Sequence, residues 1–302
     1  MLDWILSESF LVNVIAYAIP IIFASYASLI SNKAGISAIN IDGAMSVAAV
    51  TGALVSHFAN SWVIGLTCAR AAGILMRMLL ALAALKLKAD SFLSGIALNT
   101  FATGACLLIV KGVLDGRTDS STAPSVLVPN LNIPFLKDIP VLGKAVFSQN
   151  LLFFIMLAVL ILLILLLNCT RLGVQIKTAG YHHEAGESVG VSTRKTRVIA
   201  LIICGAMAGL GGAYLSMANL GYFSAGMVSG RGFIGIAAEA MGAGMPVKTT
   251  LFALLFGAVD YFAVGGQTVL SFPYELLNTL PYLMTLLALT IYAAAHNKKT
   301  NK

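Results

Sequence analysis

Long stretches of apolar residues without a charged side chain constrain the fold of this chain more than any other feature. The clearest is a run of seventeen consecutive apolar residues at 151–167. Comparable uncharged stretches cover residues 9–32, 43–69, 91–110, 198–230 and 276–295. A helix that crosses the hydrocarbon core of a membrane needs about 20 such residues. Only 10% of the 302 residues are charged and 59% are hydrophobic, which excludes a soluble enzyme and a disordered chain. The sequence predicts an all-α, polytopic membrane protein.

These stretches predict nine membrane helices, with about 8–10 as the range, in a single transmembrane domain that covers residues 1–302. The expected helices lie near residues 10–30, 36–57, 61–85, 91–113, 150–169, 197–217, 231–245, 249–267 and 274–295. The seventh is short for a membrane span. Gly205 and Gly209 are four residues apart, a spacing that lets two membrane helices pack closely.

The Lys and Arg residues predict which side of the membrane each loop faces, because cytoplasmic loops carry an excess of them. With a cytoplasmic C-terminus, twelve of the nineteen fall in cytoplasmic segments and five in outer segments, and Arg70 and Arg77 lie within the third helix. The twelve are Lys33, Lys86, Lys88, Arg171, Lys177, Arg194, Lys195, Arg197, Lys248, Lys298, Lys299 and Lys302. The five are Lys111, Arg117, Lys137, Lys144 and Arg231. The distribution predicts a multi-pass protein of the plasma membrane and argues against a nucleic-acid-binding surface.

Two hydrophilic segments remain between the apolar stretches. Residues 114–149 contain four prolines and predict an ordered outer loop, whereas residues 170–197 form the main cytoplasmic segment. The cytoplasmic segment is too small to be a catalytic domain. The sequence lacks a GxxxxGK[ST] phosphate-binding loop, so any ATP hydrolysis must occur in another subunit. We expect no enzymatic activity and no cofactor, and we expect the adjacent His182 and His183 to lie in a solvated loop rather than bind a metal.

Five ionisable side chains fall inside apolar stretches, where burying a charge is costly and function is the first hypothesis. They are Asp42, Arg70, Arg77, Glu239 and Asp260. For the two arginines and Asp260 we favour pairing within the helix bundle, or extension of the side chain to the membrane surface. The same acids could relay protons in an ion-coupled secondary transporter, and this alternative stays open.

A weak internal similarity links two of these acids. The segment KAG at 33–35 precedes Asp42, which lies seven residues after Gly35. The segment GRG at 230–232 precedes Glu239, which lies seven residues after Gly232. In the predicted topology one segment enters the membrane from the cytoplasm and the other from outside. Such a pair is typical of an inverted-topology repeat, in which interrupted helices meet near the centre of the membrane. Chance similarity in a biased composition is the competing interpretation.

Four strings, in this order along the chain, resemble one transporter family. They are LKADSFLSGIALN at 87–99, IPFLKDIPVLG at 133–143, GAMAGLGGAYLS at 205–216 and GRGFIGIAA at 230–238. They are similar to the permease subunits of bacterial nucleoside-type ABC importers, which belong with ribose and branched-chain amino-acid permeases and work with basic-membrane-lipoprotein-type binding proteins. The resemblance extends over most of the chain, from about residue 22 to residue 290. It implies an inverted-repeat permease architecture.

The resemblance also implies roles for particular residues. The string GYHHEAGESVGV at 180–191 is similar to the family's coupling segment, in which GENPEAA is common, but it departs from that pattern at 181–183. The residues implied to couple the chain to the ATPase are Gly180, Tyr181, His182, His183, Glu184, Ala185, Gly186 and Glu187. Asp42 stands where the family has a glutamate. The candidate residues for the translocation path are Asn40, Asp42, Asn99, Arg231 and Glu239.

The resemblance implies several partners besides the lipid bilayer. They are an ATPase subunit with nucleotide-binding domains, a second and longer permease subunit, and an extracytoplasmic substrate-binding lipoprotein that the outer loops at 114–149 and 218–230 would receive. The function implied is the import of nucleosides at the expense of ATP hydrolysed by the partner. Import of a simple sugar such as ribose by the same machinery is the closest alternative, and the ion-coupled secondary transporter is the alternative from another class.

Overall fold

The computed structural model describes residues 8–37, 39–131, 149–268, 279, 283–287 and 290. Within these residues the protein is helical, and the only β-type pairing is two isolated bridges. The helices are α2 (Glu8–Lys33), α3 (Ile41–Phe58), α4 (Trp62–Ala81), α5 (Ser91–Val113), α7 (Leu151–Cys169), α8 (Arg171–Tyr181), α9 (His183–Ser188), α10 (Thr193–Tyr214), α11 (Arg231–Met241) and α12 (Pro246–Gly265). The chain is therefore an all-α protein, as the apolar stretches predict.

In the described part of the chain, seven helices are long and apolar enough to cross a membrane. They are α2, α3, α4, α5, α7, α10 and α12, in which α4 continues into the π-helical turn η1 (Leu82–Lys86) and α10 into η3 (Leu215–Asn219). A short 3-10 turn, η4 (Gly266–Thr268), follows α12. Each of the seven corresponds to a predicted helix. The predicted helix at 274–295 and the part of the outer loop at 132–148 lie outside the described residues, apart from a few isolated positions.

Several predicted boundaries were wrong by three or more residues, and three of them have a clear local reason. The second helix begins at Ile41 instead of residue 36, because residues 34–37 form a turn that includes Gly35 with a φ of 72°. The seventh helix ends at Met241, ahead of Ala243 and Gly244, whose φ values of 51° and 66° are incompatible with a right-handed helix. The eighth begins three residues early, because Pro246 suits the first position of a helix.

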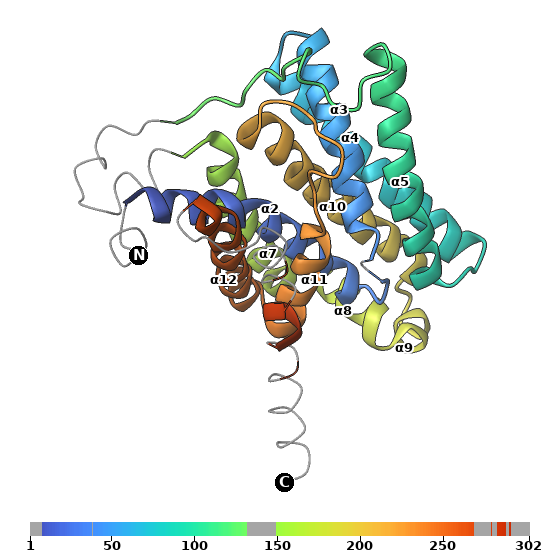
Figure 1. Cartoon of the computed structure of the whole chain (residues 1–302). Coiled ribbons are helices and arrows are strands. Elements are labelled where there is room, and N and C mark those ends of the chain that lie inside the picture. Colours follow the sequence, from blue (N-terminus) through green and yellow to red (C-terminus); the bar gives the residue numbers. More distant parts are fainter. Residues whose placement is uncertain are drawn as a thin grey trace.

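Helix α10 lies at the centre of the bundle and packs against α2, α3 and α4 (Figure 1). Glycines make the closest crossing possible. A Cβ atom added at Gly205 of α10 would lie 2.6 Å from the Cα of Ile74, and one added at Gly209 would lie 2.7 Å from the Cα of Arg70. Both distances are to α4 backbone, which cannot move aside independently. The small-residue spacing therefore reflects helix packing, as predicted.

We expect Gly205→Leu to destabilise the protein strongly, because the added side chain would push α4 away from α10. Overpacking a dense core costs about 1–3 kcal/mol or more. The matched control is Gly104→Leu on α5, because a Cβ there meets nothing within 4 Å. The measurement is the apparent Tm and the yield of the purified protein. Equal losses in the two variants would contradict this account of the α4–α10 crossing.

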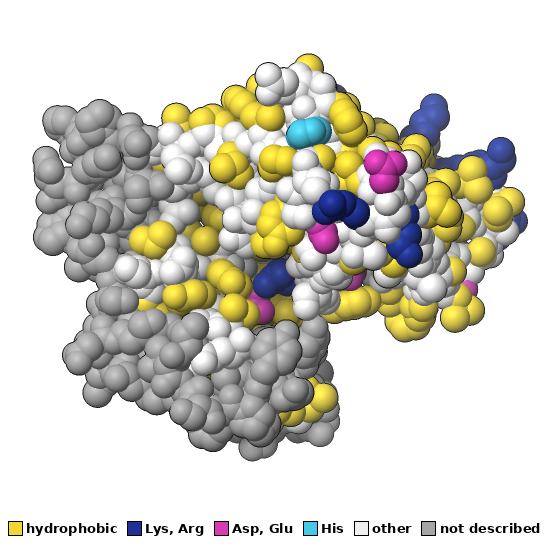
Figure 2. All heavy atoms as spheres, turned by 45° about the horizontal axis from the view of Figure 1, so that its top comes forward, with side chains coloured by type: hydrophobic (Ala, Val, Ile, Leu, Met, Phe, Trp, Pro, Cys, Tyr) yellow, Lys and Arg dark blue, Asp and Glu magenta, His cyan; other side chains and the backbone are white. Residues whose placement is uncertain are grey.

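The described Lys and Arg residues that the sequence assigned to the cytoplasm gather at one end of the bundle. Lys33, Lys177 and Lys248 line one cavity there, and Lys86 and Arg194 line another. Helices α8 and α9 lie at this end, at the lower right of Figure 1. The opposite end carries the loop after α5 and the segment after η3. Figure 2 views the molecule with that end turned forward; on the part that is not grey, hydrophobic and uncharged side chains predominate, with scattered basic side chains among them.

Candidate functional site

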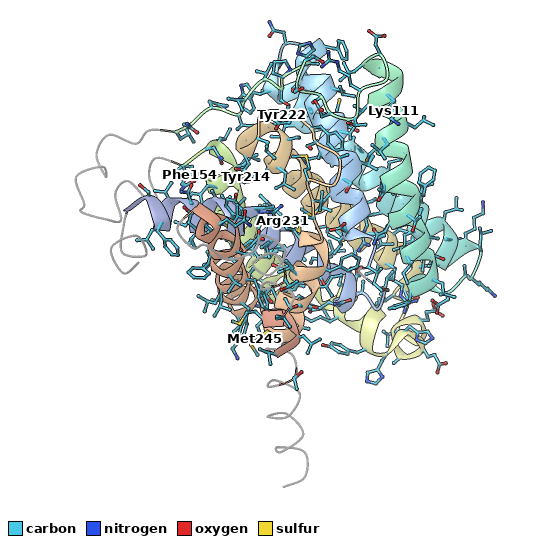
Figure 3. The ribbon with its side chains drawn as sticks, in the orientation of Figure 1. Lys111, Phe154, Tyr214, Tyr222, Arg231 and Met245 are labelled. Carbon is cyan, nitrogen blue, oxygen red and sulfur yellow. The ribbon has the colours of Figure 1, made fainter. Side chains whose placement is uncertain are left out.

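A non-helical segment enters the bundle between η3 and α11. In Figure 3 the chain passes from Tyr222 near one end to Arg231 at mid-height, and α11 then continues towards Met245 at the other end. With 11 residues, α11 spans about 16 Å, roughly half of a hydrocarbon core. Non-helical backbone at such a depth must be enclosed by protein or line a polar cavity.

The loop after α5 supplies partners for this segment. The amide nitrogen of Ser120 donates to the carbonyl oxygen of Phe223 at 2.8 Å, and the amide nitrogen of Phe223 donates to the Ser120 hydroxyl at 2.8 Å. The Ser125 amide donates to the Gly221 carbonyl at 2.8 Å. The two segments thus provide hydrogen-bond partners for each other's backbone groups. Both belong to outer loops in the predicted topology.

The N-terminal turns of α3 and α11 meet directly. The amide nitrogen of Gly232 donates to Oδ1 of Asp42 at 3.1 Å. A Cβ atom at Gly232 would lie 2.6 Å from the backbone nitrogen of Asp42, so only glycine permits this approach. Because the N-terminus of a helix carries a partial positive charge, α11 attracts the side-chain oxygen of Asp42. Gly230, with a φ of 73°, forms the N-cap that turns the chain into α11.

Asp42 lines a cavity of about 200 Å³ between α3, α5 and the loop at 223–230. The other polar side chains in its wall are Ser46, Thr103 and Ser229, and Phe223 contributes an aromatic ring. The wall thus combines one carboxylate, hydroxyl groups and an aromatic surface, the mixture typical of sites for small polar molecules. Of the five predicted path residues, Asp42 is the one that lines this cavity.

Asn40 lies just before α3, completely buried, and forms part of a network around Arg77. The Arg77 guanidinium donates to the Asn40 side-chain oxygen and, at 2.7 Å, to the Ser31 hydroxyl, and it is itself fully buried. The Asn40 amide group donates to the carbonyl oxygen of Met76 at 3.3 Å. Among the described residues no acid pairs with Arg77, so neutral polar groups stabilise its charge. Arg70, seven residues earlier on α4, is exposed.

Asn99 of α5 joins that helix to the start of α3. Its side-chain oxygen accepts a hydrogen bond from the amide nitrogen of Gly43 at 2.8 Å, and its amide group donates to the carbonyl oxygen of Ile39 at 2.9 Å. A Cβ at Gly43 would lie 2.8 Å from the Asn99 oxygen, so the two helices are in close contact. Asn99 therefore fixes the residue next to Asp42.

Arg231, at the first position of α11, pairs with Asp260 of α12. The Nε–Oδ2 distance is 2.9 Å, both side chains are largely buried, and a second hydrogen bond runs from the guanidinium to the Met227 carbonyl oxygen at 2.9 Å. The guanidinium also lies 5.6 Å from the centre of the Tyr17 ring, a cation–π distance. The pairing of Asp260 within the bundle confirms the prediction, whereas the assignment of Arg231 to an outer loop was wrong because the chain descends before α11 begins.

Glu239 lies near the other end of α11 and is 7% exposed. Its carboxylate accepts hydrogen bonds from the Asn32 amide at 2.6 Å and from the Ser28 hydroxyl at 3.4 Å, both on α2. Lys33 is its nearest basic neighbour: a Cβ placed at Gly244 would lie 3.1 Å from the Lys33 Nζ and 3.8 Å from a Glu239 oxygen. Sequence reasoning missed Ser28 and Asn32, although two polar residues one helical turn apart in an apolar helix are a detectable signal.

The two similar segments therefore lie crosswise close to each other. Asp42 of the first segment accepts from Gly232, in the string that opens the second, and Glu239 of the second electrostatically attracts Lys33, which opens the first. Two segments related by an approximate two-fold axis would make such contacts. The arrangement favours the inverted repeat, which stays a prediction, over chance similarity.

The predicted coupling segment forms the end of α8 and the short helix α9. Tyr181, His182, His183, Glu184, Ala185 and Glu187 are exposed, and Gly186 is buried against Thr178. Gly180 packs against the backbone of Lys33, at the end of α2. The Glu187 carboxylate accepts a hydrogen bond from the Thr193 hydroxyl at 2.6 Å, which links α9 to α10. The described residues contain no cluster of His, Cys, Asp and Glu that could hold a metal ion.

Arg197 of α10 connects this segment to the turn between α2 and α3. Its Nε donates to the carbonyl oxygen of Ala34 at 3.1 Å, and its terminal nitrogen donates to that of Ala179 at 2.9 Å. One guanidinium thus bridges the ends of α2 and α8. Sequence reasoning counted Arg197 only as a cytoplasmic cation, because the partners of a basic residue are set by tertiary structure.

Comparison with known proteins places the chain among transport proteins. The family model described as "Branched-chain amino acid transport system / permease component" matches residues 10–289. The guanosine ABC transporter permease protein NupQ of Bacillus subtilis (strain 168) is 33% identical over 91% of this chain and 89% of its own length. The nucleoside ABC transporter permease protein NupC of Lactococcus lactis subsp. cremoris (strain MG1363) is 29% identical over 93% and 90%. A putative glucose ABC transporter permease protein, TsgC13 of Haloferax volcanii, is 27% identical over 83% and 76%. No solved structure matches the chain.

Proposed function

Because this chain belongs to the family of permease components of branched-chain amino acid transport systems, we propose that it is the permease subunit of an ABC importer for nucleosides. The observation that carries the proposal is the similarity to two permeases named for guanosine and nucleosides, each over about nine-tenths of both chains. The seven apolar helices and the polar cavity beside Asp42 are consistent with a translocation path. The whole chain acts as one transmembrane domain.

Permeases of this family work with an ATPase and a substrate-binding protein. In the proposed complex, the ATPase contacts residues 180–187, and a substrate-binding lipoprotein contacts the outer loops at 114–149 and 218–230. A second, longer permease completes the membrane part. Six exposed side chains, four on α9 and two in the residues just before it, support the first contact. This arrangement puts the C-terminus in the cytoplasm.

The proposed path runs past Asp42. Nucleosides are uncharged and carry ribose hydroxyl groups and base N–H groups, which the Asp42 carboxylate and the Ser46 and Thr103 hydroxyls can bind, while Phe223 offers an aromatic surface to a base. The cavity of about 200 Å³ is smaller than a typical ligand pocket of roughly 300 Å³ or more, so passage requires the loop at 223–230 to move. Asn40, Asn99, Arg231 and Glu239 act on this path by holding α3 and α11 in place.

The proposed coupling route leads from α9 to the start of α3. Movement of α9 by the ATPase shifts Ala179 and Gly180, which contact Arg197 and Lys33. Arg197 holds the Ala34 carbonyl in the turn that leads to Asn40 and Asp42. A closure of the ATPase is thereby passed to the cavity as a movement of packed helices.

The test is uptake of radiolabelled guanosine and uridine by cells that lack this chain and by the same cells with it restored. We expect uptake only when the chain is present, and we expect excess unlabelled nucleoside, but not excess ribose or glucose, to compete. Loss of the ATPase should abolish uptake, while a protonophore should leave the initial rate unchanged when ATP is maintained. Competition by sugar alone would favour a sugar importer, and ATPase-independent uptake that collapses with the protonophore would favour a secondary transporter.

A further inference from the structure

A second cavity, of about 600 Å³, lies at the end of the bundle that carries most of the basic residues. It is formed by the ends of α2 and α7, the middle of α8 and the connection from α11 to α12. Figure 3 labels Met245, one of its lining residues, at this end of the molecule, away from Arg231. The cavity has no part in the path proposed above.

Three lysines from three different helices line this cavity. They are Lys33 at the end of α2, Lys177 in α8 and Lys248 in the first turn of α12. None of them makes an ion pair or a side-chain hydrogen bond in the described part of the chain. Lys33 and Lys177 are close enough to repel each other electrostatically. Three positive charges facing one space are unfavourable unless an anion occupies it.

Among the residues that the structure describes, the other charges around the cavity do not neutralise the lysines. Glu239 lies near Lys33 and attracts it, but its carboxylate is already hydrogen-bonded to Asn32 and Ser28. Within the described ranges, one acid against three lysines leaves an excess of two positive charges. The N-terminus of α12 adds a partial positive charge at the same place, because its N-cap residue Met245 provides no side-chain hydrogen bond.

Apart from Asn168, the side chains in the remaining wall of the cavity are apolar, and this wall leads towards the outer faces of two helices. Ile164 and Leu167 of α7 and Val247 of α12 line it. The outward faces next to them are also apolar and exposed: Ile161, Leu162 and Leu165 on α7, and Leu251 and Leu255 on α12. In a membrane these faces contact lipid chains. A free phosphate or a nucleotide has no acyl chain that could pack against such a wall.

We propose that this cavity binds the headgroup of an anionic phospholipid from the leaflet at the basic end of the protein. Its phosphate lies between Lys33, Lys177 and Lys248, and its acyl chains lie along the apolar faces of α7 and α12. Basic pockets between membrane helices are suited to anionic headgroups, and the apolar walls select a lipid over a soluble anion. The lipid would join the end of α2 to α8 and α12.

The experiment uses the complete purified transporter in nanodiscs of phosphatidylcholine that contain a minor fraction of phosphatidylglycerol. Native mass spectrometry measures how much phosphatidylglycerol stays bound. We expect enrichment over phosphatidylcholine in the wild-type complex, and a roughly tenfold or greater loss of it in the variant Lys33→Gln/Lys177→Gln/Lys248→Gln. The matched control, Lys86→Gln/Lys88→Gln/Lys195→Gln, removes three exposed lysines at the same end and should retain the enrichment.

Two further measurements on the wild-type complex keep the proposal testable if the triple variant does not assemble. A phosphatidylglycerol with a photoreactive acyl chain should crosslink to α7 and α12. Inorganic phosphate at millimolar concentration should not raise the Tm of the complex in pure phosphatidylcholine. Crosslinking confined to other helices, equal loss of lipid in the control, or stabilisation by phosphate that the three lysines are needed for would overturn the lipid assignment.

Discussion

Replacing Arg197 by alanine is expected to stop most uptake while the assembled complex continues to hydrolyse ATP at close to its normal rate. Arg197 is the only described side chain that holds both the Ala34 and the Ala179 carbonyl oxygens, so its loss separates the coupling segment from the turn before α3. Losing two hydrogen bonds of about 1 kcal/mol each lowers the equilibrium constant for contact between the coupling segment and the turn roughly 30-fold. The measurement compares nucleoside uptake with ATPase activity in the same reconstituted vesicles.

Two other variants show whether the geometry of Arg197 or merely its charge is needed. Arg197→Lys keeps the charge, but a single ammonium group cannot match the planar guanidinium that spans the two carbonyls, so we expect only partial recovery. Arg171→Ala removes an exposed arginine at the start of α8 and should leave uptake unchanged. Normal uptake by Arg197→Ala would contradict the proposed route. A parallel fall in ATPase activity and in the amount of complex would also contradict it, because that result would indicate a role in assembly.

Much of the bundle could be predicted from the sequence. A membrane helix makes its backbone hydrogen bonds within itself, so an apolar composition of sufficient length is enough to identify it. The apolar run at 151–167 corresponds to α7, which spans Leu151–Cys169. The main errors lie where the chain turns: residues 34–40, the entry into α11 at Gly230, and the connection from α11 to α12 at 242–245. There the backbone depends on left-handed glycines and on partners such as Ser120 and Asn99, which are distant in the sequence.

The candidate site could be predicted only in part. Asp42 and Glu239 were found because an acid in an apolar stretch is conspicuous, and the spacing from a preceding glycine linked them. The hydrogen-bond partners of Arg77 could not be foreseen, since a buried arginine is usually expected to meet an acid and here meets Asn40 and Ser31. Which of the polar residues line a cavity and which hold helices together depends on side-chain positions that no pattern specifies.

Asp42→Asn is expected to lower the maximal rate of nucleoside uptake about fivefold while leaving the amount of assembled complex unchanged. The asparagine oxygen can still accept the hydrogen bond from Gly232, so the contact between α3 and α11 remains. The negative charge that faces the cavity is lost, and a hydrogen bond to a charged group is worth about 1 kcal/mol more than one to a neutral group. Uptake as a function of nucleoside concentration provides the measurement.

The concentration dependence separates a binding-protein-dependent importer from an ion-coupled carrier. In an importer the binding protein sets the half-saturating concentration, so only the maximal rate should fall in Asp42→Asn. In a carrier that uses Asp42 as a proton relay, the half-saturating concentration and the pH dependence should change together.

Asp90→Asn is the matched control. The Asp90 carboxylate also accepts backbone hydrogen bonds at a helix start, from Phe92 and Leu93, but it is exposed and lies at the N-terminus of α5, several turns before the cavity residue Thr103. Asp42→Leu removes both the charge and the bond to Gly232, and should therefore reduce the yield of the complex as well. Equal uptake by Asp42→Asn and wild type would show that the carboxylate charge has no part in translocation and leave Asp42 with its structural contact alone.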